Sequence, residues 1–509
     1  MSHVGIDLGT TFSAISYLDE IGNPSVVPIR EGDRICPSLV YKNGEGNFKV
    51  GQIAASMAEA EPENVAGNFK RNMPTGAEIS LGGDTFTPVE MSSMILKKLK
   101  DDFESNHGPI TSAAITIPAN WQDAGRRATM EAAKRAGLPA EHIINEPTAA
   151  IFAIVKRTPL DGTVLVYDLG GGTFDVTIAK VKGSEINVLA SCGDDHLGGR
   201  DFDCALLADA NKKFEHKHGT PLVDNEDING IEFRRHQHKF ETAKKNLSIL
   251  EKAEVVLNKK GFEPFIYTVT RAEFEGLINT YLTKADQLVD VVVDDAKLTH
   301  DDIDKIVLVG GSTRIPDIQK RIFKMFGKNP ITSNVNVDEC VCLGAAIYAG
   351  LKAPQSSLNA AQQSALQNVF LTDVTPAFFG TLAWEGDSYN LKNSIILRKN
   401  MPLPCESINS FYTVHQGQEA VECKITQSGY EEEDADMVEV VGAVKLQLPR
   451  GRPANQEITA RYSYDENGIM HCEFKDVSTG SFSEYKYISK CSEGVDAANT
   501  IDLDDFIID

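Results

Sequence analysis

Two glycine-rich segments of similar sequence divide the first part of this chain into related halves. VGIDLGTTFS occupies residues 4–13, and VYDLGGGTFD occupies residues 166–175. In each copy an apolar strand leads into glycine and threonine, and another apolar strand follows. Similarity between separated segments is the signature of an internal repeat. This part of the chain is therefore predicted to form two similar units that face one another across a cleft.

Each unit also contains a second strand that ends in a loop of small residues and then opens a helix. The first such strand is AITIPA at residues 114–119, and the second is IVLVGGS at residues 306–312. Helical patterns of apolar residues lie between the strands, for example at residues 88–103 and 123–136. Strands that alternate with helices indicate an α/β domain, which we expect to span residues 1–365.

The glycine-rich turns have a chemical use. Without a Cβ atom, glycine lets the backbone N–H groups of a tight turn approach an anion closely. Asp7 and Asp168 precede the two turns, and their carboxylate oxygens are suited to holding Mg²⁺ through its waters. One such turn would be weak support for phosphate binding. One turn in each half can hold the β- and γ-phosphates of a nucleotide from both sides.

The charge balance and the apolar content exclude several classes of protein. The net charge of −23 argues against a nucleic-acid surface, because contacts to phosphate backbones require clustered Lys and Arg. No apolar run approaches the roughly 18 residues of a membrane span, and the N-terminus has no signal-peptide pattern. The nine cysteines are scattered through apolar stretches, as is typical of reduced core thiols. We expect a soluble cytoplasmic protein without nucleic-acid or membrane partners.

The composition and the apolar pattern of the sequence change in its last third. Residues 355–367 are rich in Gln, Ser and Ala, and short strand patterns separated by turn residues follow. This change predicts an interdomain linker at residues 366–374, an all-β domain at residues 375–490 and an acidic tail at residues 491–509. The tail mixes acidic and apolar residues, which fits a docking peptide for a partner or, more commonly, a disordered terminus.

These motifs resemble the nucleotide domain of the seventy-kilodalton heat-shock chaperones of the DnaK type. Residues 6–13 resemble the family's first phosphate loop, residues 167–175 its second, and residues 307–316 its adenosine loop. Residues 373–376 (DVTP) resemble the junction after the family's linker, and residues 475–480 (KDVSTG) resemble a hairpin of its β-sandwich. The resemblance covers nearly the whole chain. It implies an actin-like ATPase domain with a duplicated ribonuclease-H-like core, followed by a β-sandwich that binds peptide.

The resemblance implies ATP or ADP with Mg²⁺ as ligands, and it assigns roles to individual residues. The residues that would position the attacking water and the γ-phosphate are Lys70, Glu146, Asp168, Thr173 and Asp175. Asp7 and Asp168 would hold Mg²⁺ through water. The remaining nucleotide contacts would come from Asp7, Gly9, Thr10, Thr11, Gly170, Gly171, Gly172, Glu241, Lys244, Ser248, Gly310, Gly311, Ser312 and Arg314. Taken alone, Lys70 would be interpreted as solvated surface.

The resemblance also implies communication between the two domains. Pro118 and Arg126 match the family's proline switch and its arginine partner, and Asp373 lies at the linker junction. Without the resemblance, Pro118 would be interpreted as a strand terminator. The β-sandwich would bind an extended peptide through main-chain hydrogen bonds and an apolar pocket. The residues expected near this pocket are Tyr389, Ile396, Leu397, Val414 and Val421, with sandwich core as the competing role of Ile396 and Leu397.

The expected partners are unfolded or extended polypeptide, a J-domain co-chaperone and a nucleotide exchange factor. Several features depart from the family's pattern. Asn120, Gln122 and His142 alter the face that family members offer to J-domain co-chaperones, and residues 431–436 add a block of acid to the sandwich. The chain stops soon after the β-domain, so we expect no helical lid over the bound peptide.

Three functions are consistent with these observations. The first is an ATP-dependent molecular chaperone in which hydrolysis controls the affinity for unfolded peptide. The second is a nucleotide-binding scaffold or co-chaperone that does not cycle, which the altered partner face favours and the intact Lys70 and Asp168 disfavour. The third is a small-molecule kinase of the actin-like superfamily, which the linker and the sandwich disfavour. We take the first as our prediction.

Overall fold

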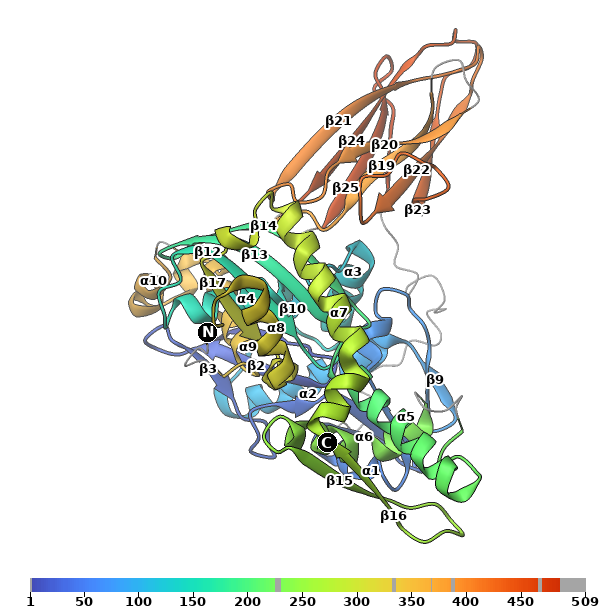
Figure 1. Ribbon diagram of the computed structural model, residues 1–509. Helices are drawn as coiled ribbons and strands as arrows, with labels where there is room; N and C mark the ends of the chain where they lie inside the picture. Colours follow the sequence, from blue (N-terminus) through green and yellow to red (C-terminus); the bar gives the residue numbers. More distant parts are fainter. Residues whose placement is uncertain are drawn as a thin grey trace.

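The computed structural model describes residues 2–224, 230–331, 336–367, 369–385, 390–465 and 469–485. Figure 1 shows a mixed α/β body and, at one end of it, a separate all-β unit drawn in orange and red. The tail predicted at residues 491–509, and with it the expected absence of a lid, lies outside the described residues. Within the described ranges, no helix is both long enough and apolar enough to cross a membrane.

The first half of the body is built on a six-stranded mixed sheet. Its order is β11-β10-β1-β2-β3, and β4 pairs with β2 outside this path. The strands are β1 (Ser2–Asp7), β2 (Phe12–Leu18), β3 (Pro24–Val27), β4 (Cys36–Pro37), β10 (Ile110–Ile117) and β11 (Ala140–Asn145). Strand β1 is parallel to β10 and antiparallel to β2. The first glycine-rich turn therefore lies at the same sheet edge as the end of β10.

The second half is built on a five-stranded sheet with the order β17-β12-β13-β14-β18. The strands are β12 (Gly162–Leu169), β13 (Phe174–Lys182), β14 (Glu185–Asp194), β17 (Lys305–Val309) and β18 (Phe370–Thr372). Strand β12 is antiparallel to β13 and parallel to β17. A hairpin with a glycine-rich turn, flanked by one parallel strand, thus occurs in both sheets.

Helices cover the two sheets. They are α1 (Gln52–Met57), α2 (Pro88–His107), α3 (Asp123–Arg135), α4 (Glu146–Val155), α5 (Gly199–His218), α6 (Ile231–Leu247), α7 (Arg271–Asp295), α8 (Pro316–Phe326), α9 (Cys340–Lys352) and α10 (Ala360–Leu366). The ends of α2 and α7 follow from local sequence. Thr87 with Glu90, and Thr270 with Glu273, form reciprocal capping boxes that satisfy N–H groups of the first helical turn.

Smaller elements complete the body. The small sheets contain β5 (Leu39–Lys42), β6 (Phe48–Val50) and β7 (Val65–Gly67), then β8 (Ile79–Leu81) with β9 (Asp84–Phe86), and β15 (Lys252–Leu257) with β16 (Phe265–Thr270). Two 3₁₀ helices, η2 (Phe69–Asn72) and η5 (Gly311–Arg314), carry residues that the sequence assigns to the nucleotide site. Both lie in connections between larger elements, where a short tight turn can present side chains to a cleft.

Helices α4 and α9 pack against one another between the two sheets. A Cβ atom on Gly344 of α9 would lie 1.7 Å from the carbonyl oxygen of Ala149 in α4. A Cβ atom on Gly5 of β1 would lie 2.0 Å from the backbone nitrogen of Ala346 in α9. Only glycine allows such close backbone approach. These contacts fix the first sheet and α4 against opposite sides of α9.

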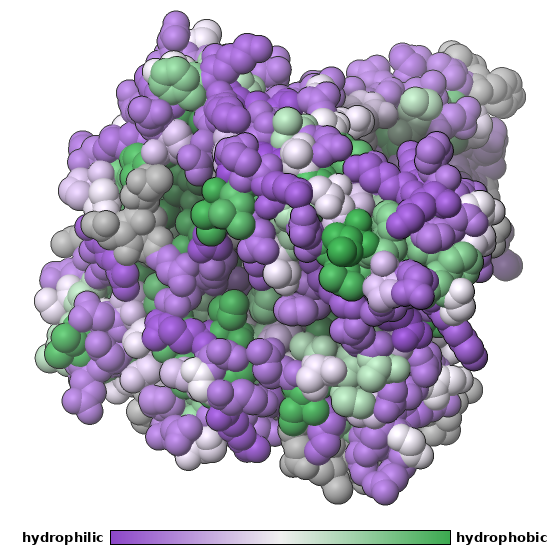
Figure 2. All heavy atoms as spheres, turned by 60° about the horizontal axis from the view of Figure 1, so that its bottom comes forward, coloured by the Kyte–Doolittle hydropathy of each residue, from purple (hydrophilic) through white to green (hydrophobic). Residues whose placement is uncertain are grey.

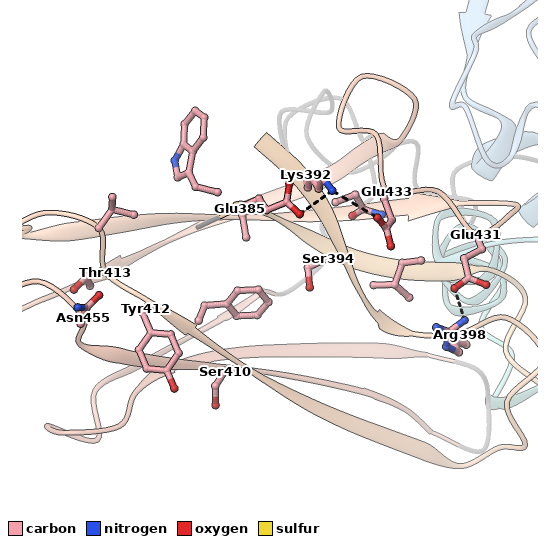
Figure 3. A pocket seen from close by; sticks show the side chains of 16 residues that line it. Glu385, Lys392, Ser394, Arg398, Ser410, Tyr412, Thr413, Glu431, Glu433 and Asn455 are labelled. Atoms are coloured by element: carbon pink, nitrogen blue, oxygen red, sulfur yellow. Dashed lines mark hydrogen bonds and ion pairs between the residues drawn. The ribbon is translucent and has the colours of Figure 1, made fainter. Parts of the chain in front are cut away.

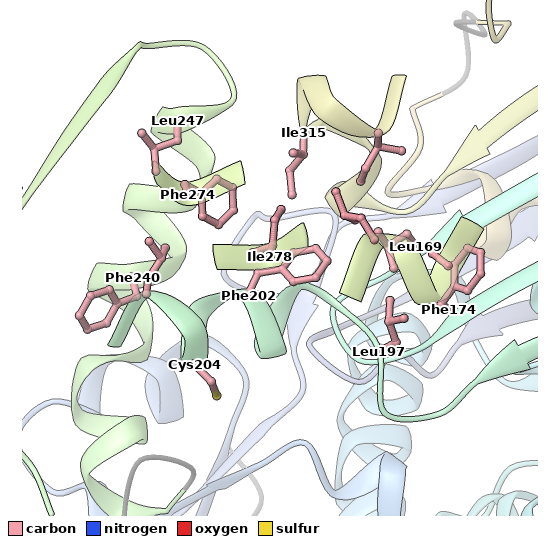
Figure 4. Close-up of a cluster of buried hydrophobic side chains, with 14 of the residues drawn as sticks. Leu169, Phe174, Leu197, Phe202, Cys204, Phe240, Leu247, Phe274, Ile278 and Ile315 are labelled. Carbon is pink, nitrogen blue, oxygen red and sulfur yellow. The ribbon is translucent and has the colours of Figure 1, made fainter. Parts of the chain in front are cut away.

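The core of the second half lies beneath α5, α6 and α7. Figure 4 shows Phe202, Phe240, Phe274 and Ile278 pointing into this core from the helices, with Phe174 reaching it from the sheet. All five side chains are at most 1% exposed. Burial of one such side chain contributes about 1.5–3 kcal/mol. The core therefore holds the second glycine-rich turn, which directly precedes Phe174, on a rigid support.

The all-β unit is a sandwich of two four-stranded sheets. One sheet has the order β20-β19-β22-β23, and the other has the order β21-β24-β25-β26. The strands are β19 (Phe378–Trp384), β20 (Leu391–Leu397), β21 (Cys405–Tyr412), β22 (Ala420–Ser428), β23 (Glu439–Gln447), β24 (Glu457–Tyr464), β25 (Met470–Asp476) and β26 (Phe482–Tyr485). Phe379 and Tyr462 are fully buried between the sheets. Strand β18, which lies within the predicted linker, pairs with β14 of the body.

Candidate functional site

The two glycine-rich turns, η2, the start of α4 and the loop after β17 meet at a cleft between the halves. A cavity of about 110 Å³ lies there. The predicted site residues that line it are Asp7, Gly9, Thr10, Lys70, Glu146, Asp168, Gly170, Thr173, Gly310 and Gly311. The fold thus brings side chains from both halves of the body into one small space.

Glycine is required in these turns because the backbone segments touch. A Cβ atom on Gly171 would lie 2.0 Å from Oγ1 of Thr11, and one on Gly172 would lie 2.3 Å from Cγ2 of Thr10. Gly310 has a φ of +80°, and a Cβ atom there would lie 2.4 Å from a backbone carbonyl oxygen. Larger residues would separate the two halves or strain the loop.

Lys70 is the buried cation of the cleft. Its side chain is 3% exposed and forms an ion pair with Glu146, whose side chain is 10% exposed. The ammonium group also lies 5.5 Å from the centre of the Trp121 ring, within reach of a cation–π interaction. A lysine is rarely buried unless it is paired. Its position is therefore set by Glu146 on one side and by an aromatic face on another.

Carboxylates crowd around this ion pair. Burial and the charge of Glu146 raise the pKa of Asp7 to about 7. The same causes, in the same order, hold the pKa values of Asp168 and Asp175 well above their ordinary range. Among the residues that the structure describes, Oδ2 of Asp168 has no hydrogen-bond partner. Hydrated Mg²⁺ would supply the missing positive charge and a hydrogen-bond donor, so Asp7 and Asp168 fit the ion that the sequence implies.

Backbone and side-chain donors orient two of these carboxylates. Thr116 donates a hydrogen bond of 3.0 Å from Oγ1 to Oδ1 of Asp7. The backbone N–H groups of Ala119 and Asn120 donate to Oδ1 of Asp175 over 3.0 and 3.3 Å. Ala119 directly follows Pro118, so the predicted switch proline lies one residue from a donor that fixes Asp175.

The residues predicted to contact the nucleoside lie along the rim of the cleft. On α6, the ammonium group of Lys244 donates to Asp203 over 2.9 Å, and Oγ of Ser248 donates to the Lys244 carbonyl oxygen over 3.4 Å. Glu241 lines a wider cavity of about 440 Å³ between α1 and α6. In η5, Oγ of Ser312 donates to the Gly170 carbonyl oxygen over 2.8 Å. These residues are near one another but do not all line one cavity.

The wider cavity has a basic rim. Arg234, Arg235, Lys239 and Lys245 line it from α6, together with Thr10 and Thr11 from the first glycine-rich turn. Figure 2 shows a face of the molecule that is mostly hydrophilic, with hydrophobic residues in small separate groups. Lys239 pairs with Glu59 and Lys245 pairs with Glu241, so acidic residues balance part of this positive charge.

Arg71 is a cleft residue that sequence reasoning missed. It follows Lys70 on η2, is 7% exposed and donates from Nε to the Gly172 carbonyl oxygen over 2.7 Å. It also makes a bidentate ion pair with Asp201 at the start of α5. This side chain ties the first half of the body to the second glycine-rich turn. Two adjacent cations shortly after a strand are visible in the sequence, but their burial is not.

Arg126, the predicted partner of the proline switch, lies in a buried polar chain. It is 3% exposed and donates to the Trp121 carbonyl oxygen over 3.1 Å and to Oδ1 of Asn145 over 2.9 Å. Asn145 in turn donates to Asp373 over 2.9 Å and directly precedes Glu146. The predicted allosteric residues Arg126 and Asp373 are therefore connected through one asparagine beside the Lys70–Glu146 pair.

The sandwich contacts the body through α3 and α7. Arg127 donates to the Met470 carbonyl oxygen over 3.2 Å, and the Met470 N–H donates to Asp123 over 3.4 Å. Lys399, between β20 and β21, pairs with Asp295 at the end of α7 over 2.8 Å. Asp123 opens α3, which follows the Pro118 loop. The sandwich is thus held against the same segment that orients Asp175.

The sandwich carries an apolar groove of about 390 Å³. Val414 and Val421, two of the residues predicted to contact peptide, line it. Ile396 and Leu397 instead lie in the sandwich core, 5% and 0% exposed, in the role that competed with peptide contact in the sequence. Tyr389 lies outside the described residues. The lining residues that were missed include Leu382, Trp384, Leu391, Phe411, Tyr412 and Ile458.

A larger cavity of about 890 Å³ adjoins this groove and shares Trp384 and Tyr412 with it. Figure 3 shows its charged rim, where Lys392 reaches toward Glu385 and Glu433, and Arg398 pairs with Glu431. The acidic block predicted at residues 431–436 therefore lies along β20. The N–H of Asn393 donates to the Glu433 carbonyl oxygen over 2.8 Å, which places this block against the strand.

Fold and site together define a mixed α/β protein with a charged cleft between two related halves and an attached β-sandwich. The sequence matches the family described as Hsp70 protein over residues 3–77 and 72–502. The chain therefore belongs to the Hsp70 family. The family implies an actin-like ATPase domain and a β-sandwich, and it supports a chaperone role.

Curated relatives agree with this assignment. The chain is 37% identical over 489 residues to proteins named Chaperone protein DnaK from Thermotoga petrophila, Thermotoga neapolitana and Thermotoga maritima. Each alignment covers 94% of this chain and 78% of the relative. The similarity thus extends through both the body and the sandwich.

Proposed function

We propose that this protein is an ATP-dependent molecular chaperone that hydrolyses ATP in the cleft and binds extended polypeptide on the sandwich. The observation that carries the proposal is the buried Lys70–Glu146 pair between the two glycine-rich turns, next to an Asp168 oxygen that has no hydrogen-bond partner among the described residues. Phosphoryl transfer to water depends on positioning and on charge stabilisation, and this cleft is built from groups that supply both.

Each residue of the cleft would have its own role in the reaction. Lys70 would neutralise charge that develops on the γ-phosphate, and Thr173 would donate to a phosphate oxygen. Glu146 and Asp175 would orient the attacking water, whose oxygen bonds to the γ-phosphorus as the bond to the ADP oxygen breaks. Mg²⁺ bound with the nucleotide, near Asp7 and Asp168, would neutralise the β- and γ-phosphates. The products are ADP and phosphate.

Residues on the rim of the cleft would bind the nucleoside. Glu241, Lys244 and Ser248 approach it on α6, and Arg314, which pairs with Asp338 over 2.8 Å, approaches it from η5. Because these contacts come from the second half and the first phosphate turn comes from the other, a bound nucleotide would hold the two halves together. ATP and ADP, which differ by one phosphate, would do so differently.

Control of peptide affinity would pass through the Pro118 loop and Arg126. The loop that donates to Asp175 continues into α3, which holds Met470 of the sandwich. Asn145 links Arg126 and Asp373 beside Glu146. A change of charge in the cleft can therefore bias the contacts that hold the sandwich, which is the physical requirement for allostery.

The groove beside Trp384 and Tyr412 would take the apolar part of an extended peptide. Val414 and Val421 supply aliphatic contacts. The outer strands β20 and β21 contribute residues to the groove and would offer main-chain donors and acceptors. Further partners in this proposal are a J-domain co-chaperone and a nucleotide exchange factor. The cytoplasm, where nucleotide is abundant and thiols stay reduced, is the proposed location.

Single-turnover ATP hydrolysis by the purified chain, with and without an extended apolar peptide, tests this function. We expect slow hydrolysis that peptide accelerates. Val421→Glu should weaken peptide binding and remove the acceleration, while the hydrolysis rate without peptide stays unchanged. Val440→Glu, at an exposed position outside the groove, is the matched control. Tight nucleotide binding without turnover would contradict the proposal and favour a scaffold that does not cycle.

A further inference from the structure

Arg71 joins the two halves of the body behind the second glycine-rich turn. It lies on η2 between Phe69 and Met73, whose side chains are buried in the core of the first half. Its guanidinium group donates from Nε to the Gly172 carbonyl oxygen over 2.7 Å, and from its two terminal nitrogens to Asp201 over 3.1 and 2.6 Å. Both partners belong to the second half. The arginine is therefore anchored in one half and binds the other.

The three glycine carbonyl groups of the second turn all accept hydrogen bonds. Those of Gly170 and Gly171 accept from backbone N–H groups at the start of α5 over 3.0 and 2.8 Å. The carbonyl group of Gly172 accepts from Arg71. The turn is thus fixed at two peptide groups by a helix of its own half, and at the third by a side chain from the opposite half.

The direction of the Gly172 carbonyl group sets the direction of the next N–H group. The peptide bond between Gly172 and Thr173 is trans, so its C=O and N–H bonds point in opposite directions. The Thr173 N–H group therefore points away from Arg71. Thr173 lines the cavity between the two turns, and its N–H group has no hydrogen-bond partner among the residues that the structure describes. A fixed donor without a partner beside a small cavity is available to an anion.

We propose that Arg71 is a positioning residue for phosphate binding, which holds the Gly172 carbonyl group so that the Thr173 N–H group faces a phosphate of the nucleotide. The inference rests on the proposed ATPase function. Arg71 acts through the peptide group that it binds and does not touch the nucleotide. Its positive charge also polarises that peptide group, which strengthens the N–H group as a donor. Because η2 belongs to the first half, the donor is fully oriented only while the two halves are together.

Asp201 holds the guanidinium group in the orientation that this contact requires. A carboxylate that binds two nitrogens of an arginine fixes the plane of the guanidinium group. Asp201 also accepts from the N–H group of Gly198 over 2.8 Å, at the start of α5. The same carboxylate therefore connects Arg71 to the helix that holds the first two glycines of the turn.

Arg71→Lys tests the geometry, because lysine keeps the charge but lacks the planar fork that binds Gly172 and Asp201 together. We expect the affinity for a non-hydrolysable ATP analogue with Mg²⁺, measured by titration calorimetry, to fall about tenfold or more, the size expected for losing a hydrogen bond to a charged group. The affinity for adenosine, which has no phosphate, should stay within about twofold, a margin we take as unchanged binding. General loosening of the cleft would weaken both ligands equally.

Asp201→Asn reaches the same contact from the other half and provides a second variant if Arg71→Lys does not fold. The asparagine oxygen can still accept from the N–H group of Gly198, so the start of α5 is retained, while the charged pair with Arg71 is lost. We expect weaker binding of the ATP analogue and unchanged binding of adenosine. Arg461→Lys is the control. It alters an ion pair with Glu406 on the sandwich and leaves the cleft unaltered, so both affinities should be normal.

The failure of this role and the failure of the proposed function give different results. Normal affinity of both cleft variants for the ATP analogue, or equal losses for the analogue and adenosine, would overturn the role of Arg71 while the unaltered chain still hydrolyses ATP. If the unaltered chain binds no ATP analogue and hydrolyses no ATP, the proposed function fails, and the role of Arg71 fails with it.

Discussion

Replacing Lys70 with methionine should damage both catalysis and stability, and the two effects can be separated. The ion pair with Glu146 is nearly fully buried, with side chains 3% and 10% exposed. Removal of one member of such a pair leaves a buried charge without compensation and destabilises a protein by about 3–5 kcal/mol. Removal of one charge that stabilises the transition state slows a reaction by about 100–1,000-fold. Lys70→Met should show both losses.

The double variant Lys70→Met with Glu146→Gln separates the two causes. It removes both charges, so most of the lost stability should return, while hydrolysis should stay lost. Stability of the cleft can be followed by urea unfolding with the fluorescence of Trp121, which faces Lys70, in a Trp384→Phe background. A double variant as unstable as Lys70→Met, or normal ATP hydrolysis by Lys70→Met, would contradict this prediction.

Three further predictions concern the turns, the carboxylates and the linker. Gly172→Ala should weaken ATP binding by at least tenfold in a nucleotide titration, because the added Cβ atom overlaps Thr10; Gly183→Ala, in an open turn, controls for the loss of a glycine. The pKa of Asp7 is raised from 3.8 to about 7. Between these two pH values the Asp7 carboxyl is therefore protonated in the folded chain and ionised in the unfolded chain. The stability of the nucleotide-free protein should therefore fall as the pH rises through this window; Asp7→Asn should make the fall smaller, and an equal slope in both proteins would contradict the assignment. Asp373→Ala should abolish acceleration by peptide while basal hydrolysis stays unchanged, and unchanged acceleration would exclude the Asn145 connection.

Much of the fold could be predicted from the repeat in the sequence, because the repeat combines two physical constraints. Apolar strands must be buried, and glycine must lie where the backbone turns tightly or approaches another segment. Both constraints are met at residues 4–13 and 166–175, where each segment forms a hairpin beside one parallel strand. The contact between the two turns could not be predicted from either segment alone. It depends on how α4 and α9 join the sheets.

Burial of charged residues was the main limit of sequence reasoning at the cleft. A lysine followed by an arginine in a short connection is usually solvated, yet Lys70 and Arg71 are both buried by partners from other elements. Such pairs are formed by tertiary structure and leave no local pattern.

The sandwich illustrates a second limit. Alternation of apolar residues indicated strands, but it did not distinguish the core face from the groove. Ile396 and Leu397 face the core, whereas Val414 follows β21 and reaches the groove. A shift of one residue in register exchanges the two faces of a strand. Trp384 and Tyr412, which are half exposed beside the groove, lie at strand ends where this alternation stops.

In the proposed function, nucleotide in the cleft controls peptide binding on the sandwich. The most direct test is the dissociation rate of a fluorescent extended peptide from the full chain, measured with ATP and with ADP. We expect rates that differ by at least about tenfold, within the usual range of allosteric coupling, and we expect Arg126→Ala to make them equal. Equal rates with ATP and ADP in the unaltered protein would contradict the claim.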